Sequence, residues 1–345
     1  MSSVQKYAAV NAKVRALKAR LLRDEDYKNM LAMGNEVEIV RYLKEKTAYN
    51  HVLKDIDPDN YNRQDFEFCL RKAILDDYEK IIHFLTGESK QVLKVLTMVR
   101  YEVEDLKLIL RSISRGEDPG EITNRFLRKE SFTGVNREEL VKARTIEDFV
   151  ERLKGTIYYR PLKTLTQEDM EKRQFHMEMN IDNAYFELLF KHIEKLDPED
   201  RELMLMQVGT NVDLQNIHFI YRALTFYKLT GVEIFNYALP FGYYLKGKTL
   251  KRICFSGTPE NFMAEMRSTS YWSLLERGVS DIFMERAMSQ ALYDNYQTVG
   301  SMNITQIIEY YHRIEFEMRD IISITEAVGY GMEYNDARKY LIRRI

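Results

Sequence analysis

One pattern recurs in three stretches of this sequence: residues 102–109 read EVEDLKLI, residues 213–220 read DLQNIHFI, and residues 317–324 read EMRDIISI. Each stretch begins with an acid, has Asp or Asn at its fourth position and Leu or Ile at its fifth, and ends with Ile. Their starts are 111 and 104 residues apart. Positions one, four, five and eight share one face of an α-helix. We therefore expect three helices with the same packing role.

Two further markers recur at nearly the same spacing. The first is an aromatic residue followed thirteen residues later by an aliphatic one: Tyr27 and Val40, Phe149 and Leu162, Phe262 and Leu275. The second is a tyrosine in a preceding helix: Tyr78, Tyr185 and Tyr296. Three markers in one order at a period of about 110 residues indicate three copies of one helical unit. We predict units at residues 1–117, 118–231 and 232–345, which either close around a pseudo-threefold axis or stack in a line.

The composition predicts an all-α fold. The 345 residues include 15 Gly and 6 Pro, about half the average usage of these helix breakers. Leu, Glu, Lys, Arg and Met, which favour helices, are abundant.

Local signals place individual helices. Asp197 followed by Pro198 is typical of a helix start, and we expect this helix to end at residues 209–211. The next helix is expected to end near Gly231. Thr166 predicts the start of another helix that reaches about residue 196. A short piece at residues 234–239 has an ambiguous, strand-like alternation.

The charge and the cysteines exclude some classes of protein. The chain has 51 basic and 53 acidic side chains, a net charge of −2, which excludes a uniformly basic nucleic-acid binder. Cys69 and Cys254 are far apart and lie in apolar surroundings, as in a cytosolic protein with reduced thiols; a disulfide would depend on a distance that sequence does not supply. The longest stretch without a charge has 14 residues, whereas a membrane span needs about 20.

The first 23 residues carry six basic side chains and no acid. This charge pattern resembles an organellar presequence. We favour an ordinary amphipathic helix, because Val10, Val14, Leu17 and Leu21 form one apolar stripe.

One stretch imitates a nucleotide-binding site. GYYLKGKT, from Gly242 to Lys248 and Thr249, fits the phosphate-loop pattern. A working phosphate loop connects a strand to a helix and cradles phosphates with backbone N–H groups. The interior of this stretch is bulky and no parallel-sheet pattern surrounds it. The alternatives are a nucleotide-binding protein that uses this loop and a turn with an exposed basic tip; we favour the turn.

No other motif predicts chemistry. Asp55, Asp57 and Asp59 imitate the start of a calcium loop, but Asn60 and Phe66 stand where that loop needs glycine and a bidentate acid. The histidines and cysteines lack ligand spacing. We predict no catalytic, cofactor or metal site.

Two arginines follow the apolar stripe of the repeated motif. Arg111 and Arg222 each stand two residues after the last Ile. Either they form ion pairs that fix helix packing within a unit, or they line a cavity between units. We favour the pairing.

The repeated motifs resemble a known family, the C subunits of archaeal and bacterial V-type (A-type) ATPases, whose eukaryotic counterpart is the d subunit of the vacuolar ATPase. Residues 7–16 (YAAVNAKVRA) resemble its opening, residues 213–222 its central motif, residues 239–242 (LPFG) its following turn, and residues 317–329 its closing helix. Lys13, Phe241 and Asp320 depart from the usual Arg, Gly and Asn. The resemblance covers nearly the whole length.

The resemblance implies a funnel-shaped, all-helical protein of three similar domains without catalytic residues. In that family the protein is part of the rotor: it lies on the cytoplasmic mouth of the proteolipid ring and receives the D and F subunits of the shaft in its central concavity. The implied function is to couple the shaft to the ring for proton or sodium transport, peripheral to the membrane. It also explains Gly242 as part of a Pro-x-Gly turn, which argues against the phosphate loop.

Basic residues are the candidates for contacts with these partners. We predict interface positions at Lys13, Arg15, Arg111, Arg222, Lys246, Lys248 and Arg252.

Overall fold

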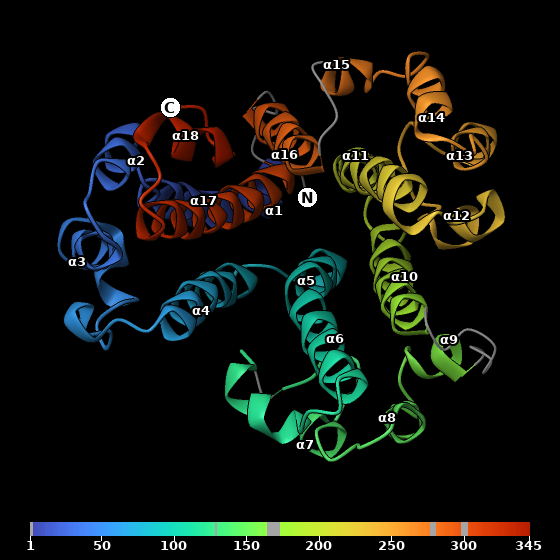
Figure 1. The fold of residues 1–345 in the computed structure, drawn as a ribbon, viewed down its shortest axis with the longest axis horizontal. Helices are drawn as coiled ribbons and strands as arrows, with labels where there is room; N and C mark the ends of the chain where they lie inside the picture. Colours follow the sequence, from blue (N-terminus) through green and yellow to red (C-terminus); the bar gives the residue numbers. More distant parts are fainter. Residues whose placement is uncertain (1–2, 128–129, 164–172, 277–280, 298–302) are drawn as a thin grey trace.

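The computed structural model describes residues 3–127, 130–163, 173–276, 281–297 and 303–345 (Figure 1). Within these ranges the chain forms helices and no β-strand, which confirms the all-α class. No described helix is both long enough and apolar enough to cross a membrane.

The long helices form the inner part of the molecule. They are α1 (Ser3–Lys18), α4 (Arg63–Ile82), α6 (Arg100–Ser114), α10 (Arg173–Ile193), α11 (Pro198–Arg222), α16 (Asp281–Gln297) and α17 (Thr305–Gly329), together with the shorter α5 (Gly87–Lys94), which continues into α6. A π-helical turn, Val95–Val99, joins α5 to α6 without a break. A second π-helical turn, Ala223–Tyr227, ends α11.

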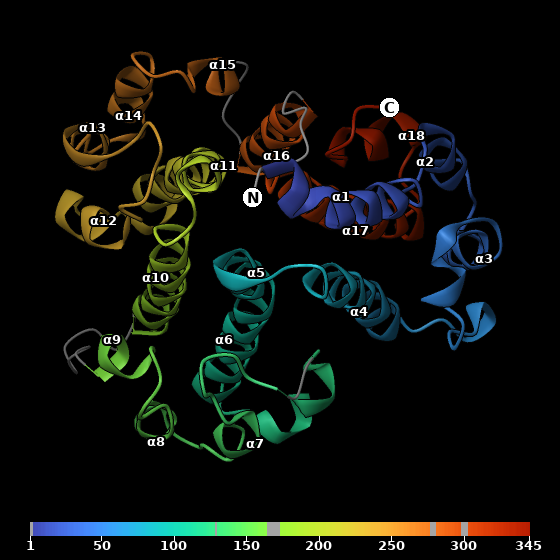
Figure 2. The same cartoon turned by 180° about the vertical axis from the view of Figure 1, so that it is seen from behind.

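Short helices lie outside the long ones in both views (Figures 1 and 2). They are α2 (Asp24–Leu31), α3 (Glu36–Lys46), α7 (Arg137–Leu140), α8 (Ile146–Arg152), α9 (Tyr159–Lys163), α12 (Gly231–Tyr237), α13 (Gly247–Cys254), α14 (Pro259–Met266), α15 (Trp272–Leu275) and α18 (Tyr334–Ala337). Short 3-10 turns link them at Ala48–His51, Pro58–Asn60, Pro119–Arg125 and Arg338–Tyr340.

Polar side chains define where several short helices begin. The side chains of Asn35, Thr145 and Thr258 each accept a hydrogen bond from the backbone N–H three residues ahead. Such N-caps satisfy donors that have no partner inside the helix. Thr230 and Glu233 form a reciprocal capping box at the start of α12.

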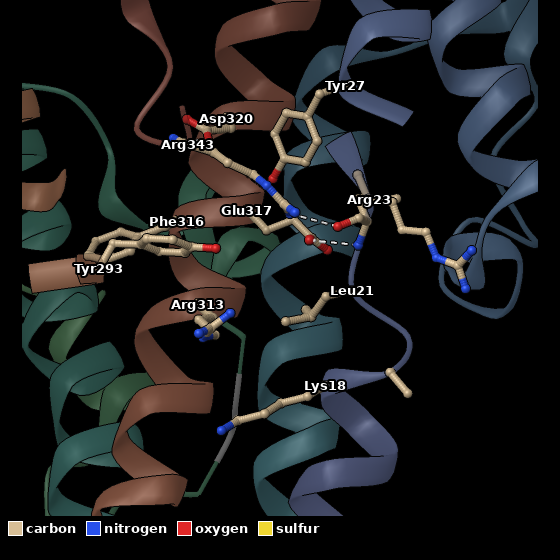
Figure 3. Close-up of a pocket in the computed structure, with 12 residues that line it drawn as sticks. Lys18, Leu21, Arg23, Tyr27, Tyr293, Arg313, Phe316, Glu317, Asp320 and Arg343 are labelled. Atoms are coloured by element: carbon tan, nitrogen blue, oxygen red, sulfur yellow. Dashed lines mark hydrogen bonds between the residues drawn. The ribbon is translucent and has the colours of Figure 1, made fainter. Parts of the chain in front are cut away.

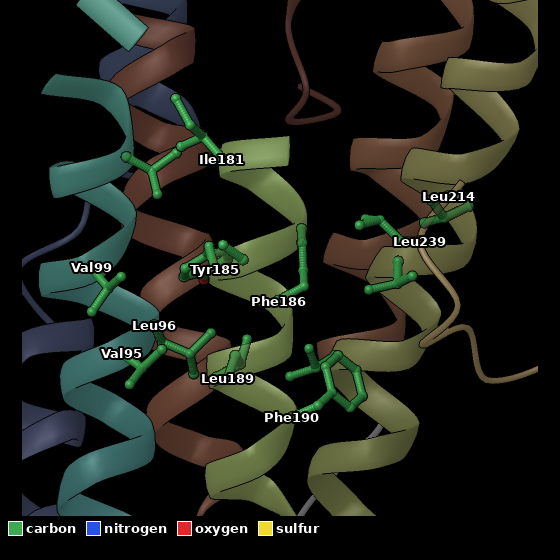
Figure 4. Packing of buried hydrophobic residues seen from close by; sticks show 14 of the residues in the cluster. Val95, Leu96, Val99, Ile181, Tyr185, Phe186, Leu189, Phe190, Leu214 and Leu239 are labelled. Carbon is green, nitrogen blue, oxygen red and sulfur yellow. The ribbon is translucent and has the colours of Figure 1, made fainter. Parts of the chain in front are cut away.

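The core is a continuous layer of apolar side chains between the long helices (Figure 4). Val99 of the π-turn and Ile181 and Leu189 of α10 are buried on the side where α6 packs against α10. On the other side of α10, the ring of Phe190 stacks on Phe241 with a centroid distance of 4.5 Å. Because α10 is apolar on both sides, it connects α6 to the segment that follows α11.

A second buried cluster joins the two ends of the chain. Tyr27 of α2 and Val40 of α3 pack with Ile321 and Ile324 of α17. The guanidinium of Arg343 donates to the carbonyl oxygen of Leu22 at 2.7 Å. Helix α17 and the C-terminal residues therefore complete the packing of α2 and α3.

The predicted break in α11 was wrong. The helix continues through Gly209, whose carbonyl oxygen accepts a hydrogen bond from the backbone N–H of Tyr243 at 3.2 Å. A Cβ atom at Gly209 would lie 3.0 Å from Cβ of Tyr243. The glycine therefore permits the close approach of a loop rather than a helix end.

The strand-like piece at residues 234–239 is largely helical, because α12 spans Gly231–Tyr237. The two cysteines are free thiols, which agrees with the reduced state that the sequence predicts. The predicted start at Thr166 and the side chain of Tyr296 lie outside the described residues. The remaining aromatic and aliphatic residues of the two spaced markers are buried, as a repeated packing role requires.

Candidate partner interface

Each of the three repeated motifs begins with a buried acid that binds a tyrosine from an outer segment. The hydrogen bonds run from Tyr158 to Glu102 (3.1 Å), from Tyr271 to Asp213 (2.8 Å) and from Tyr49 to Glu317 (2.8 Å). Each tyrosine comes from an outer segment: Tyr49 lies in a 3-10 turn, Tyr158 directly before α9 and Tyr271 directly before α15. These contacts cross the predicted boundaries at 117/118 and 231/232, and the boundaries themselves stay a prediction.

The fourth position of each motif also anchors another segment. Asp105 accepts from Nε of Arg137 at 2.7 Å. Asn216 donates to the carbonyl oxygen of Leu239 and accepts from its N–H, both at 2.8 Å. Asp320 accepts from the backbone N–H groups of Ile342 (2.7 Å) and Arg343 (3.0 Å). The repeated helices are thus each fastened to their surroundings at two points one turn apart.

Burial makes these carboxyl groups harder to ionise. Burial raises the pKa of Asp105 to about 7, although the nearby Arg137 opposes the shift. It raises the pKa of Glu317 to about 7 and that of Asp320 to about 6. The pKa of Asp213 is also raised by burial, against the hydrogen bonds that it accepts. These groups serve as structural anchors, because backbone, tyrosine or arginine donors occupy them.

The loop that imitates a phosphate site is occupied by a side chain of the protein. Asp213 accepts from the backbone N–H groups of Tyr244 (2.7 Å) and Leu245 (3.0 Å). A Cβ atom at Gly242 would clash with the carboxylate of Asp213 and lie 2.5 Å from the carbonyl oxygen of Leu245. The glycine therefore makes room for an acid of the protein itself.

This geometry argues against the nucleotide-binding alternative. The segment before the loop contains helix α12 instead of the strand that a phosphate loop requires. The N–H groups at Tyr244 and Leu245, which a phosphate would need, are directed at Asp213. The stretch is the turn with an exposed basic tip: Lys246 and Lys248 are exposed.

A polar pocket of about 260 Å³ lies where α11, α16 and α17 meet the start of α6. Its polar lining comprises Arg100, Asn211, Gln215, His218, Ser289, His312, Glu315 and Arg319. Arg100 donates to Glu315 at 3.0 Å and to the hydroxyl of Tyr311 at 2.9 Å. Burial lowers the pKa of His312 to about 3, and Arg100 adds to this effect. The lining therefore carries two arginines, Arg100 and Arg319, and one carboxylate, Glu315, which is paired with Arg100.

A second pocket of about 320 Å³ lies between the two ends of the chain (Figure 3). Arg343 stacks on Tyr27 there, and Arg313 stacks on Tyr293, both at 5.0 Å. Glu309, next to this pocket, binds both Lys18 (2.6 Å) and Arg313 (2.7 Å). Since Lys18 and Arg313 both pair with Glu309, and Arg343 pairs with Asp24, the residues of this pocket join α1, α2, α17 and the C-terminal residues.

The two arginines of the repeat have different surroundings. Arg111 forms a bidentate pair with Glu178 of α10, at 2.9 and 2.5 Å, so it fixes helix packing, across the predicted unit boundary. The guanidinium carbon of Arg222 lies 6.0 Å from the ring centroid of Phe226 and 6.0 Å from that of Tyr227. Neither arginine lines either pocket. The arginines that line the pocket of about 260 Å³, named the central pocket below, are Arg100 and Arg319.

The other predicted interface residues form two separate groups. Lys13 and Arg15 lie on α1, whereas Lys246, Lys248 and Arg252 lie at α13, and Figures 1 and 2 show these helices well apart. Arg252 forms an ion pair with Glu265 at 2.6 Å. Their role as partner contacts stays a prediction.

Sequence reasoning missed the central pocket and the tyrosine anchors. A signal existed for two of them: Tyr158 and Tyr271 each stand nine residues after the repeated Phe149 and Phe262. Tyr49 breaks that spacing. No sequence pattern indicated the central pocket, because its lining residues come from helices that are far apart in the chain.

Comparisons with known proteins decide the family. A family model described as ATP synthase (C/AC39) subunit matches residues 10–340. The chain belongs to this family. The resemblance to the C subunits of A-type ATPases is thereby confirmed.

Individual relatives agree with this assignment. The C subunit of the A-type ATP synthase from Methanosarcina acetivorans is 28% identical over 317 residues, which cover 88% of this chain and 84% of the relative. The C subunits of the A-type ATP synthases from Methanocaldococcus jannaschii and Haloferax volcanii are 25% and 22% identical. They cover 80% and 94% of this chain, and 68% and 94% of their own lengths.

Proposed function

We propose that this protein is a non-catalytic central-stalk component of an A/V-type ATP synthase. It couples rotation of the shaft, formed by the D and F subunits, to rotation of the membrane proteolipid ring, and so serves proton or sodium transport. The observation that carries the proposal is the family match, which extends over residues 10–340.

The proposed arrangement is a funnel of three similar units around a pseudo-threefold axis, with boundaries near 117/118 and 231/232. The support is the threefold recurrence of one contact: an acid at the start of the repeated motif bound by a tyrosine of an outer segment. Equal contacts at equal positions are expected of units that share one architecture.

Transmission of torque requires a body that deforms little. Close-packed interiors have low compressibility, and α10 is packed on both sides by α6 and by the segment after α11. The buried anchors of Glu102, Asp213 and Glu317 hold the outer segments on the long helices. The helices would therefore move as one piece.

The shaft is proposed to dock at the central polar pocket. Its lining includes Gln215, His218 and Arg319, and exposed polar groups beside fixed positive charge suit a polar, partly electrostatic contact. The ring is proposed to contact the opposite face through its cytoplasmic loops. The basic residues Lys13 and Arg15 remain candidates for one of these contacts.

Affinity purification from native membranes tests the proposal. The tagged wild-type chain is expected to recover the shaft and proteolipid proteins. Gln215, an exposed residue of the pocket, offers a sharper variant: Gln215→Arg adds bulk and charge at the proposed shaft seat. It is expected to reduce shaft recovery at least tenfold while the ring is retained.

Gln64→Arg on the exposed start of α4 is the matched control and should leave both recoveries unchanged. Recovery of neither the shaft nor the ring by the folded wild-type chain would refute the proposed function. Equal shaft recovery by Gln215→Arg would refute the proposed seat.

A further inference from the structure

Helix α12 and the residue that follows α13 expose three large apolar side chains. The exposed fractions are 57% for Val232, 39% for Phe235 and 47% for Phe255. Single exposed apolar residues are ordinary, but a contiguous group that is held in place marks a contact surface. We name Val232, Phe235, Lys248, Lys251 and Phe255 the aromatic–basic patch.

The members of this patch lie next to one another. Val232 and Phe235 are three residues apart on α12 and so share a face. The ring centroids of Phe235 and Phe255 are 6.3 Å apart. A Cβ atom at Gly231 would lie 2.9 Å from the Phe255 ring, so the absence of a side chain lets the start of α12 lie directly against Phe255.

The two lysines extend the patch along α13. Lys248, Lys251 and Phe255 recur at intervals of three and four residues, on the face opposite the buried Leu250 and Ile253. The ammonium of Lys251 lies 5.8 Å from the ring centroid of Phe255. Positive charge and aromatic surface therefore occupy one continuous face.

The acids nearby do not neutralise this face. Residues 228–255 contain five basic side chains and a single acid, Glu233, which is engaged in the cap at Thr230. Glu265 pairs with Arg252. In the described part of the chain, no acidic side chain forms an ion pair with Lys248 or Lys251. The patch is thus cationic in a chain whose net charge is −2.

We propose that the aromatic–basic patch docks on an anionic phospholipid surface. Phenylalanines beside lysines are typical of segments that rest at the boundary between lipid headgroups and acyl chains. Protein–protein interfaces favour arginine and are depleted in lysine, whereas both unneutralised cations here are lysines. A lysine's flexible point charge suits a fluid layer of headgroups better than a fixed bidentate partner.

This docking does not depend on the proposed function. It requires only the folded chain and a lipid surface, and it is a contact that the chain would make without the shaft or the ring. Each cation near an anionic membrane strengthens binding by about fivefold. Loss of both lysines should therefore weaken binding by about 30-fold, and added salt should weaken it further.

Vesicle flotation with the purified full-length chain tests the proposal. The vesicles contain either phosphatidylcholine alone or equal parts of phosphatidylcholine and phosphatidylglycerol. Wild type should float with the anionic vesicles and not with the neutral ones. The double variants Lys248→Glu/Lys251→Glu and Phe235→Ser/Phe255→Ser should each lose flotation.

The matched control is Lys46→Glu/Lys154→Glu, which makes the same charge change at two exposed lysines on other outer segments. It should float like wild type. Three outcomes would overturn the proposal: no flotation of wild type, equal flotation with neutral vesicles, or an equal loss in the control. The patch could instead bind an acidic protein. In that case wild type does not float, and the variant Lys248→Glu/Lys251→Glu loses that protein in affinity purification. This result also overturns the lipid proposal.

Discussion

Helices α6 and α11 carry the same motif but hold its fourth position in opposite ways. On α6 this position is Asp105, a buried acid paired with the charge of Arg137 at 2.7 Å. On α11 it is Asn216, a neutral amide that makes two hydrogen bonds with the backbone of Leu239. One helix is therefore fastened by an ion pair and the other by a neutral pair.

The difference shows that the two helices share the position of the anchor but not the chemical group that forms it. A buried ion pair must recover the cost of removing two charges from water, and burial accordingly raises the pKa of Asp105. An amide that satisfies both a donor and an acceptor avoids that cost. The ion-paired helix should consequently be the more sensitive one to loss of its partner.

The largest expected effect is the loss of the arginine on the α6 side. Arg137→Met leaves Asp105 buried without its countercharge, and we expect the free energy of unfolding to fall by about 3–5 kcal/mol in chemical denaturation. Arg144→Met, which removes an exposed arginine paired with Asp118, should cost less than about 1 kcal/mol. The double variant Asp105→Leu/Arg137→Met should regain only part of the loss, because Arg137 also lies 3.9 Å from the buried carboxylate of Glu102. An equal loss of unfolding free energy in Arg137→Met and Arg144→Met would show that the buried ion pair on α6 contributes no more than an exposed one.

The next effect concerns the loop that binds Asp213 on the α11 side. Gly242→Ala places a Cβ atom against the Asp213 carboxylate, and the loop must shift to relieve the clash. We expect a loss of about 3 kcal/mol, at the upper end of ordinary substitutions. Gly34→Ala is the control, since its Cβ would meet only ordinary contacts near 3.8 Å. Similar melting temperatures for the two variants would contradict the close packing at Gly242.

A third variant gives α11 the same acid that α6 has at the fourth motif position, but supplies no arginine to pair with it. Asn216→Asp retains an acceptor for the N–H of Leu239 but sets a carboxylate against its carbonyl oxygen. We expect a loss of about 2 kcal/mol near neutral pH, which shrinks as the pH falls and the new carboxyl group is protonated. Asn261→Asp, at an exposed site, should change stability by less than about 0.5 kcal/mol. A pH-independent loss would argue against the electrostatic explanation.

The smallest effect extends the comparison to α17. Burial raises the pKa of Glu317 from 4.5 to about 7, so the native state binds this proton more tightly than the unfolded chain does. Its contribution to stability is therefore lost as the pH rises through about 7 and is fully present below about 4.5. Glu317→Gln cannot titrate. Between about pH 8 and pH 6, the melting temperature of wild type relative to this variant should increase, by the equivalent of about 1 kcal/mol. A constant difference would show that Glu317 titrates normally.

Much of the fold could be predicted, because it depends on local signals. The helical periodicity, the scarcity of Gly and Pro, and the recurring motif indicate an all-α chain, and buried residues do occupy the repeated positions. The helix end predicted at Gly209 was wrong for a simple reason. A glycine that allows a loop to pack against a helix cannot be distinguished, from sequence alone, from a glycine that ends a helix. The partners of Asp105 and Glu317 could not be predicted, since they come from segments 32 and 268 residues away.

The family, the helical class and the three motif positions follow from the amino-acid sequence, because each depends on residue types at fixed spacing. What those positions bind depends on how the helices pack. This packing directed the N–H groups of the loop after Gly242 at Asp213 instead of a phosphate, and it assembled a central pocket around Arg100 and Arg319. Spacing along a chain specifies which side chains share a helix face, but the distances between helices arise only when their apolar faces pack together.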